Sequence, residues 1–71
     1  MTSLTTNYSH LANNIRKYRK KKGLTQNELC DLLDISREHL AKVETMRRKP
    51  SLDLLFRIAI ALDIEVKYLF D

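Results

Sequence analysis

Arg37, Glu38 and Lys42 follow Ser36 at spacings that a helix would bring to one side of its surface. Arg37 can donate two parallel hydrogen bonds to guanine O6 and N7, and Glu38 can accept one from the cytosine amino group. Glu38 and Lys42 also stand four residues apart with the acid first, so they can form an ordinary surface ion pair. The three side chains therefore predict base-reading groups, with a charged surface of no special role as the alternative.

Apolar residues set the direction of this segment. Leu40 and Val43 recur at the spacing of one helical face, so we expect them to point inward and to leave the three charged residues outward, beside Ala41. The charged residues would then lie on the exposed side of a short helix.

Polar and cationic residues on either side of this segment suit phosphate groups. Gln26 opens an expected helix whose free backbone N–H groups and dipole favour an anion. The expected phosphate contacts are Thr25, Gln26, Ser36, Arg47, Arg48, Lys49 and Arg16. The lysines at 20–22 would add long-range attraction, although the dipole at a helix C-terminus favours cations there in any case.

The charges are distributed unevenly along the chain. Residues 1–27 carry six cations and no acid, and residues 28–35 carry three acids and no cation, within a formal net charge of +4. Residues 36–49 carry five cations and two acids, whereas residues 50–71 carry two cations and four acids. A fold that joins the two basic segments would suit a polyanion, with double-stranded DNA the leading candidate. Solubility alone would explain the same charges.

No pattern for catalysis or for a metal or cofactor stands out. Cys30 is the one cysteine, which excludes an internal disulfide, and His10 and His39 form no site with it at this spacing. There is no glycine-rich phosphate loop and no plausible triad. We therefore expect no enzyme, no catalytic residue, no cofactor and no metal. Without a signal peptide or a spanning apolar run, we expect a cytoplasmic, nucleoid-associated protein that binds no membrane.

The elements that carry these residues are expected to be helices. One Gly and one Pro leave few turns to build, and the apolar residues recur at helical spacing. Residues 1–9 lack a clear period and are expected to form a flexible arm. The first helix should begin near His10 with Ser9 as its N-cap, and Gly23 should close it.

A tight hinge separates the second and third helices. Thr25 and Glu28 form a capping box that opens the second helix, and Ser36 caps the third after a hinge at 34–36. Two short helices joined in this way form a helix-turn-helix, here at about 25–45. Helices near 51–62 and 65–70 should follow. The expected inward residues are Leu11, Ile15, Tyr18, Leu29, Leu32, Leu33, Leu40, Val43, Leu52, Leu55, Ile58, Ala59 and Leu62.

The stretch TQNELCDLLDISREHLAKVE, followed by KPSLDLLFRIAIAL, resembles the Cro/CI phage-repressor class of DNA-binding domains, also called the XRE type. The resemblance runs from about residue 15 to residue 70. The matching features are Arg19, Gly23, Leu24, Thr25, Gln26, Leu29, Leu33, Ile35, Leu40, Val43, Glu44, Pro50, Ser51, Ile58 and Ala59. The resemblance implies an all-α fold, a compact five-helix bundle like that of lambda repressor, over residues 10–71. It also implies that the helix near 36–46 reads the major groove of DNA and that Gln26 clamps a phosphate.

The resemblance also implies a role for two charged residues, and the sequence departs from the family pattern at three positions. Arg19 and Glu44 are expected to form a partly buried ion pair that ties the first helix to the end of the third. The family usually has Ala at Cys30 and Gly at Asp34 and Met46. Cys30 fits the core, and Asp tolerates a left-handed backbone. Methionine does so poorly, so the third helix is expected to end differently or to run on.

The helix near 51–62 carries more apolar residues than one face needs. Phe56 and Ile60 lie off its inner stripe, and Val66, Tyr68 and Phe70 add apolar side chains at the end of the chain. A small monomer rarely exposes a large apolar patch, so these five residues are expected to form the interface of a two-fold homodimer. The alternative is that Phe56 or Phe70 folds back into the core.

Two functions follow from these observations. The first is a sequence-specific transcription regulator that binds a near-palindromic operator as a two-fold dimer. The second is an antitoxin-like or other interaction module whose apolar surface at the last two helices binds a different protein.

Overall fold

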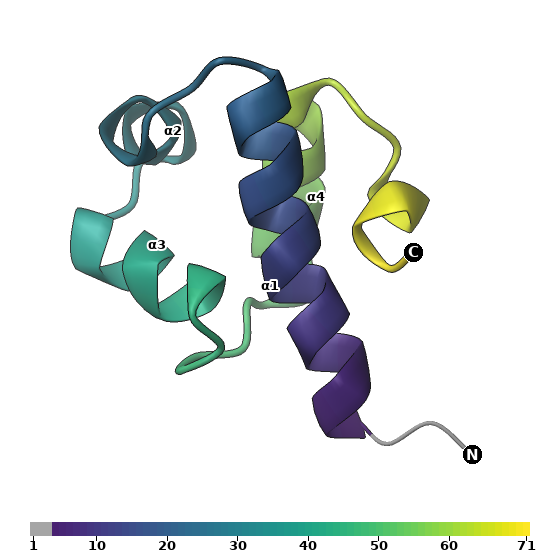
Figure 1. Cartoon of the computed structure of the whole chain (residues 1–71). Coiled ribbons are helices and arrows are strands. Elements are labelled where there is room, and N and C mark those ends of the chain that lie inside the picture. Colours follow the sequence, from purple (N-terminus) through teal and green to yellow (C-terminus); the bar gives the residue numbers. More distant parts are fainter. Residues whose placement is uncertain (1–3) are drawn as a thin grey trace.

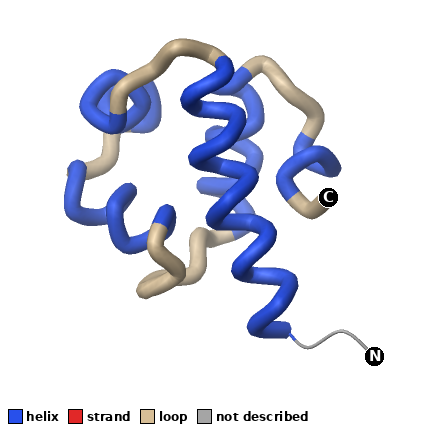
Figure 2. The backbone as a smooth tube through the Cα atoms, viewed as in Figure 1, coloured by secondary structure: helices blue, strands red, loops and turns tan. Residues whose placement is uncertain are grey.

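The computed structural model describes the backbone of residues 4–71 and the side chains from His10 onward, and the expected all-α fold is confirmed (Figure 1). The elements are α1 (Leu4–Lys21), α2 (Gln26–Leu33), α3 (Arg37–Glu44), α4 (Leu52–Leu62) and the 3-10 helix η1 (Val66–Leu69). In Figure 2, α1 crosses the middle of the molecule, with α2 and α3 on one side and η1 on the other. The short fifth helix expected at 65–70 is therefore present as one 3-10 turn.

The first helix begins earlier than expected. We predicted a start near His10 with Ser9 as N-cap, which is wrong because α1 begins at Leu4. No Gly or Pro interrupts residues 4–9, and a helix that is already nucleated adds one hydrogen bond for each residue that it fixes. Residues 1–3 of the predicted arm lie outside the described residues.

The core lies between α1 and the other four elements. Its buried apolar residues are Leu11, Ile15, Leu29, Cys30, Leu33, Leu40, Val43, Leu54, Leu55, Ile58, Ala59, Leu62 and Leu69. Asn14 Nδ2 donates to the Leu69 carbonyl at 3.0 Å and so holds η1 against α1. Cys30 is buried, as predicted, and its burial raises the pKa of the thiol.

Two leucines that we expected in the core point to solvent. Leu32 is 60% exposed and Leu52 is 66% exposed. On α2 the inward stripe is narrow and passes through Leu29 and Leu33, which leaves Leu32 on the flank. On α4 the inward stripe begins at Leu54, almost opposite to Leu52 on the helix. The apolar spacing therefore predicted a buried face that is one leucine too wide on each of the two helices.

The turn of the helix-turn-helix has the predicted local chemistry. Thr25 Oγ1 accepts from the Glu28 N–H at 3.1 Å, and Glu28 Oε1 accepts from the Thr25 N–H at 2.9 Å, which completes the capping box. Asp34 then adopts a left-handed conformation with φ of 55°. Ser36 Oγ accepts from the His39 N–H at 3.0 Å and starts α3. Together these caps stop α2 and start α3 within three residues.

All four α-helices end in the same hydrogen-bonding pattern around a left-handed residue. These residues are Gly23, Asp34, Met46 and Asp63. At α3 the Met46 N–H bonds to the Val43 carbonyl and the Arg47 N–H to the Lys42 carbonyl, which is the Schellman motif. Met46 has φ of 66°, so the expectation that its side chain would prevent a left-handed cap is wrong. The hydrogen bonds of the motif offset the backbone cost at Met46.

Candidate nucleic-acid interface

The outward face of α3 presents the three charged residues that the sequence singled out. Arg37, Glu38 and Lys42 are exposed, while Leu40 and Val43 of the same helix are buried. Figure 1 shows α3 at the left edge of the molecule, with α2 above it and α1 to its right. The fold therefore leaves this face open to a large partner.

Glu38 and Lys42 form the surface ion pair that was the alternative explanation. Lys42 Nζ lies 3.0 Å from Glu38 Oε1, and both side chains are largely exposed. Such pairs contribute about 0.3–0.5 kcal/mol, so a bound anion can displace the carboxylate at little cost. The pair and a role in binding are therefore compatible.

A buried ionic cluster fixes the opposite side of α3. Arg19 and Glu44 are 8% and 1% exposed, and Arg19 Nε and Nη2 lie 2.8 and 3.2 Å from Glu44 Oε2 and Oε1. Gln26 Nε2 donates to Glu44 Oε1 at 3.0 Å, and Arg19 Nη1 donates to the Leu24 carbonyl at 2.9 Å. We call Arg19, Gln26 and Glu44 the Glu44 cluster. It ties the end of α3 to α1 and to the first residue of α2.

Arg16 adds a second tie to the same end of α3. Its guanidinium donates to the backbone carbonyl of Glu44 and to Asn13 Oδ1. We expected Arg16 among the phosphate contacts, whereas here it satisfies a carbonyl at a helix C-terminus, which is a favourable place for a cation. This tertiary contact gave no signal in the sequence.

The starts of α2 and α3 meet at an open hollow. Arg19, Thr25, Gln26, Asn27 and Arg37 line a space of about 290 Å³. Three of these residues were expected to contact DNA, and the fold brings them together from two helices. Asn27, which the sequence did not single out, joins them from the first turn of α2, where backbone N–H groups lack a partner within the helix.

The hydroxyl groups at the two N-caps keep a hydrogen to donate. Thr25 and Ser36 each accept a backbone hydrogen bond with the side-chain oxygen. A hydroxyl that accepts in this way retains its own O–H as a donor. Both groups can therefore cap a helix and bind a phosphate oxygen at the same time.

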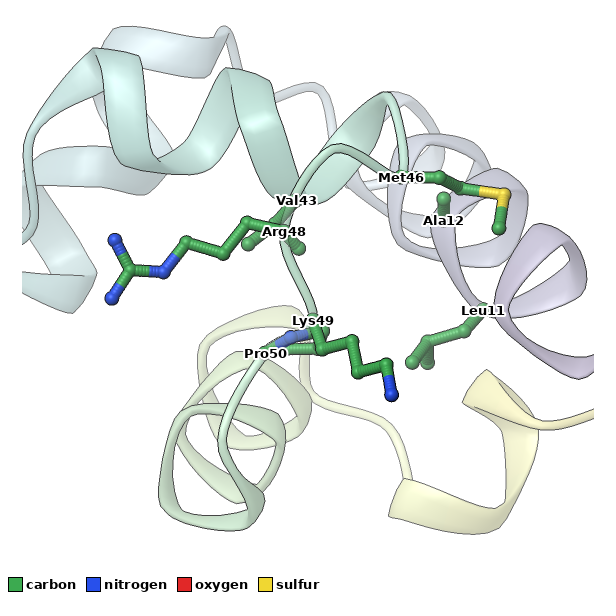
Figure 3. Close-up of a pocket in the computed structure, with 7 residues that line it drawn as sticks. All are labelled: Leu11, Ala12, Val43, Met46, Arg48, Lys49 and Pro50. Carbon is green, nitrogen blue, oxygen red and sulfur yellow. The ribbon is translucent and has the colours of Figure 1, made fainter. Parts of the chain in front are cut away.

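The basic loop, residues 47–49, follows α3 and lies beside an apolar pocket of about 210 Å³. Leu11, Ala12, Val43, Met46 and Pro50 line the pocket together with Arg48 and Lys49. Figure 3 shows the Arg48 side chain extending away from the pocket and the Lys49 side chain pointing toward Leu11. Apolar residues thus make up most of the pocket lining, and the Arg48 side chain reaches outward.

The residues expected at a dimer interface fall into two groups. Phe56, Ile60, Tyr68 and Phe70 are exposed, so the alternative that Phe56 or Phe70 folds into the core is wrong. Val66 is half-buried and packs against the core. Lys67 Nζ lies 5.4 Å from the centre of the Tyr68 ring. The exposed members come from α4 and from η1 with its C-cap, two elements that pack against each other.

Within residues 10–71, His, Cys, Asp and Glu side chains form no group that could hold a metal ion. Among the described helices, none is both long and apolar enough to span a bilayer.

The helix-turn-helix family model matches residues 15–69. The chain belongs to the helix-turn-helix family. The resemblance to the Cro/CI, or XRE, class is thereby confirmed, since the similar proteins of this helix-turn-helix family include phage and bacterial regulators of that type.

Three similar proteins illustrate the range of this helix-turn-helix family. The chain is 36% identical over 58 residues to the transcriptional regulator SlrR of Bacillus subtilis, covering 80% of this chain and 38% of SlrR. It superposes with a TM-score of 0.84 on the restriction-modification controller protein C.AhdI from Aeromonas hydrophila, at 35% identity over 89% of this chain and 96% of that one. The biofilm regulator SinR, solved in complex with DNA, gives a TM-score of 0.79 at 29% identity, covering 86% and 98%. The chain thus spans little more than a third of SlrR but almost all of the two solved domains.

Proposed function

We propose that this protein regulates transcription by binding a specific DNA sequence, with α3 in the major groove. The observation that carries the proposal is the arrangement of α3, whose outward face offers Arg37, Glu38 and Lys42 while the Glu44 cluster holds its other side. An α-helix about 10–12 Å wide fits the major groove of B-DNA. SinR, which has a similar fold and was solved in complex with DNA, supports this role.

In this proposal the contacts divide between specificity and affinity. Arg37, Glu38 and Lys42 contact base edges, and the phosphate contacts are Thr25, Gln26, Ser36, Arg47, Arg48 and Lys49. Phosphate contacts supply most of the affinity and make it fall with salt, at about −0.9 in the log–log slope for each neutralised phosphate. Binding of this kind places the protein at the nucleoid in the cytoplasm, and it needs no catalytic residue or cofactor.

We further propose that the protein binds a near-palindromic operator as a two-fold dimer. The dimer surface would comprise Phe56, Ile60, Tyr68 and Phe70, with the half-buried Val66 at its edge. Large apolar side chains exposed together on two packed elements are uncommon on a small monomer and support an interface. A dimer that sets two α3 helices about 34 Å apart would match successive turns of the major groove.

Selection of bound sequences from a random DNA pool tests the binding proposal. We expect a recurring half-site repeated with two-fold symmetry. In Arg37→Ala, preference at one base pair of the half-site should relax, at a cost of about 1–3 kcal/mol. Lys67→Ala is the matched control, because it removes an exposed cation on η1, away from α3. No enrichment from the pool, or an Arg37→Ala preference that equals the parent's, would contradict the assignment.

Sedimentation tests the dimer separately. The parent should sediment as a dimer at micromolar concentration, and Phe56→Asp should sediment as a monomer. Asn27→Asp introduces the same charge at an exposed residue of α2, an element that contributes nothing to the dimer surface, and it should remain dimeric. Equal monomer masses for parent and Phe56→Asp would remove the dimer from the proposal and favour a different protein as the partner of this surface.

A further inference from the structure

The outward faces of α2 and α4 form a surface that the proposed DNA contacts leave unused. Leu32 on α2 and Ile60 on α4 are 60% and 79% exposed. Together with Arg57 and Ala61 they line an open groove of about 280 Å³. The groove lies between the two helices, and three of its four lining side chains are aliphatic.

Arg57 contributes its stem to the groove while its charged end has partners elsewhere. Its guanidinium donates to the Leu33 carbonyl at the end of α2 and lies 4.0 Å from Asp53 Oδ2. Long cationic side chains often lay their methylene groups along apolar surface in this way. The hydrogen bond to Leu33 also joins α4 to α2, so the two walls of the groove are fixed relative to each other.

Carboxylates dominate the exposed charges of the two helices that form the groove. The exposed acids of α2, α4 and their C-caps are Glu28, Asp31, Asp34, Asp53 and Asp63. Within α2 and α4, Arg57 is the one basic residue, and it already lies beside Asp53. Asp63 Oδ2 also lies 3.9 Å from Lys22 Nζ of α1. The two helices that form the groove therefore carry more exposed carboxylates than cations, the opposite of the basic α3 side.

We propose that this groove binds a basic amphipathic helix of a different protein. Apolar residues three and four apart on such a helix would enter the groove between Leu32 and Ile60, and its lysines and arginines would meet the carboxylates. A second copy of this chain is a poor occupant, because a two-fold contact would set these carboxylates against their own equivalents. Leu32 and the acidic residues also lie outside the proposed dimer surface, with which the groove shares Ile60.

A synthetic helical peptide tests the proposal directly. The probe is a fluorescein-labelled amphipathic peptide about four turns long, with leucines at helical spacing and Lys or Arg on its other faces. Anisotropy should report saturable binding that weakens with salt. The same peptide with glutamates in place of the cations should not bind. Equal binding of the two peptides would overturn the charge assignment, and binding of neither would overturn the proposal.

Two matched aspartate substitutions locate the site. Leu32→Asp should weaken binding of the basic peptide by about 30-fold, the effect of losing an interface hot spot. Leu52→Asp adds the same charge at a similarly exposed leucine outside the groove and should change affinity less than about twofold. Since both side chains are largely exposed, both variants should fold, which thermal unfolding would verify.

A charge-removal variant and the amide shifts of the peptide complex test the location of the site further. Asp31→Asn should weaken binding of the basic peptide and make its affinity less dependent on salt, because it removes one carboxylate next to Leu32. Amide shifts induced by the peptide should centre on Leu32, Ile60 and Ala61. Equal losses in the two aspartate variants, or shifts centred on Tyr68 and Phe70, would overturn the groove as the site. DNA binding by Leu32→Asp should equal the parent's, so failure of this proposal and failure of DNA binding are measured independently.

Discussion

Glu44→Gln should destabilise the protein severely, because it leaves the Arg19 guanidinium buried without a counter-charge. Breaking a buried ion pair by removing one partner typically costs about 3–5 kcal/mol. At about 0.05–0.15 kcal/mol per residue, a chain of 71 residues has roughly 4–11 kcal/mol of stability in all. The variant should therefore lose about a quarter or more of its free energy of unfolding.

Urea denaturation followed by circular dichroism measures this loss. Glu38→Gln is the matched control, since Glu38 is an exposed acid on the same helix and its pair with Lys42 is worth about 0.3–0.5 kcal/mol. The double variant Arg19→Met with Glu44→Leu should recover most of the lost stability, because well-packed apolar groups often replace a buried pair without cost. A cost under about 1 kcal/mol for Glu44→Gln, or a double variant as unstable as the single one, would refute the reasoning.

Three further predictions concern the caps and the basic loop. Met46→Gly should be about 1 kcal/mol more stable than Met46→Ala, because both lose the side chain but only glycine adopts a φ of 66° without strain. Its midpoint in urea should accordingly lie at a higher concentration, and equal midpoints for the two variants would contradict the strain at this position. Arg48→Ala should weaken binding to all DNA sequences alike and reduce the salt slope by about one, as titration at several salt concentrations would show; a change confined to one sequence would instead make Arg48 a base contact. The Thr25 N–H that bonds to Glu28 holds the pKa of that carboxyl below its ordinary value, so its stabilising effect should be full above the ordinary pKa and disappear as pH falls through the lowered one. The advantage of the parent over Glu28→Gln in urea should accordingly shrink between pH 7 and about pH 3, and a constant difference would argue against it.

Features set by neighbouring residues in the chain could be predicted from the sequence. The capping box at Thr25, the hinge at Asp34 and the cap at Ser36 each depend on side chains within a few residues of the backbone groups that they satisfy. For the same reason, the direction of Arg37, Glu38 and Lys42 followed from Leu40 and Val43. Local chemistry thus predicted the helix-turn-helix and the outward face of α3.

Features that depend on the width of a packed face could not be predicted from periodicity. Leu32 and Leu52 have the spacing of core residues but are exposed, because the face that each helix packs inward is narrower than its apolar pattern. The contact of Arg16 with the Glu44 carbonyl joins residues far apart in the sequence. The start of α1 at Leu4 depends on propagation of the helix beyond the part that packs against other elements. The left-handed backbone at Met46 depends on the two hydrogen bonds of the Schellman motif. Each of these outcomes is decided by tertiary packing or by backbone cooperativity rather than by residue type.

Among the described side chains, Arg16, Arg19 and Gln26 all bond to Glu44, the last residue of α3. The first turn of α3 is held by the Ser36 cap, by the Cys30 thiol that donates to the Ser36 carbonyl, and by the apolar contacts beneath it. The polar side-chain contacts thus concentrate at the C-terminal end of α3, and the side chains at 37 and 38 lie at its N-terminal end. Under the proposed function, replacing residues 37 and 38 by other residues would change the preferred operator without affecting the folding of the domain. A new regulator with a new target could then arise from this scaffold through substitutions confined to one helical turn.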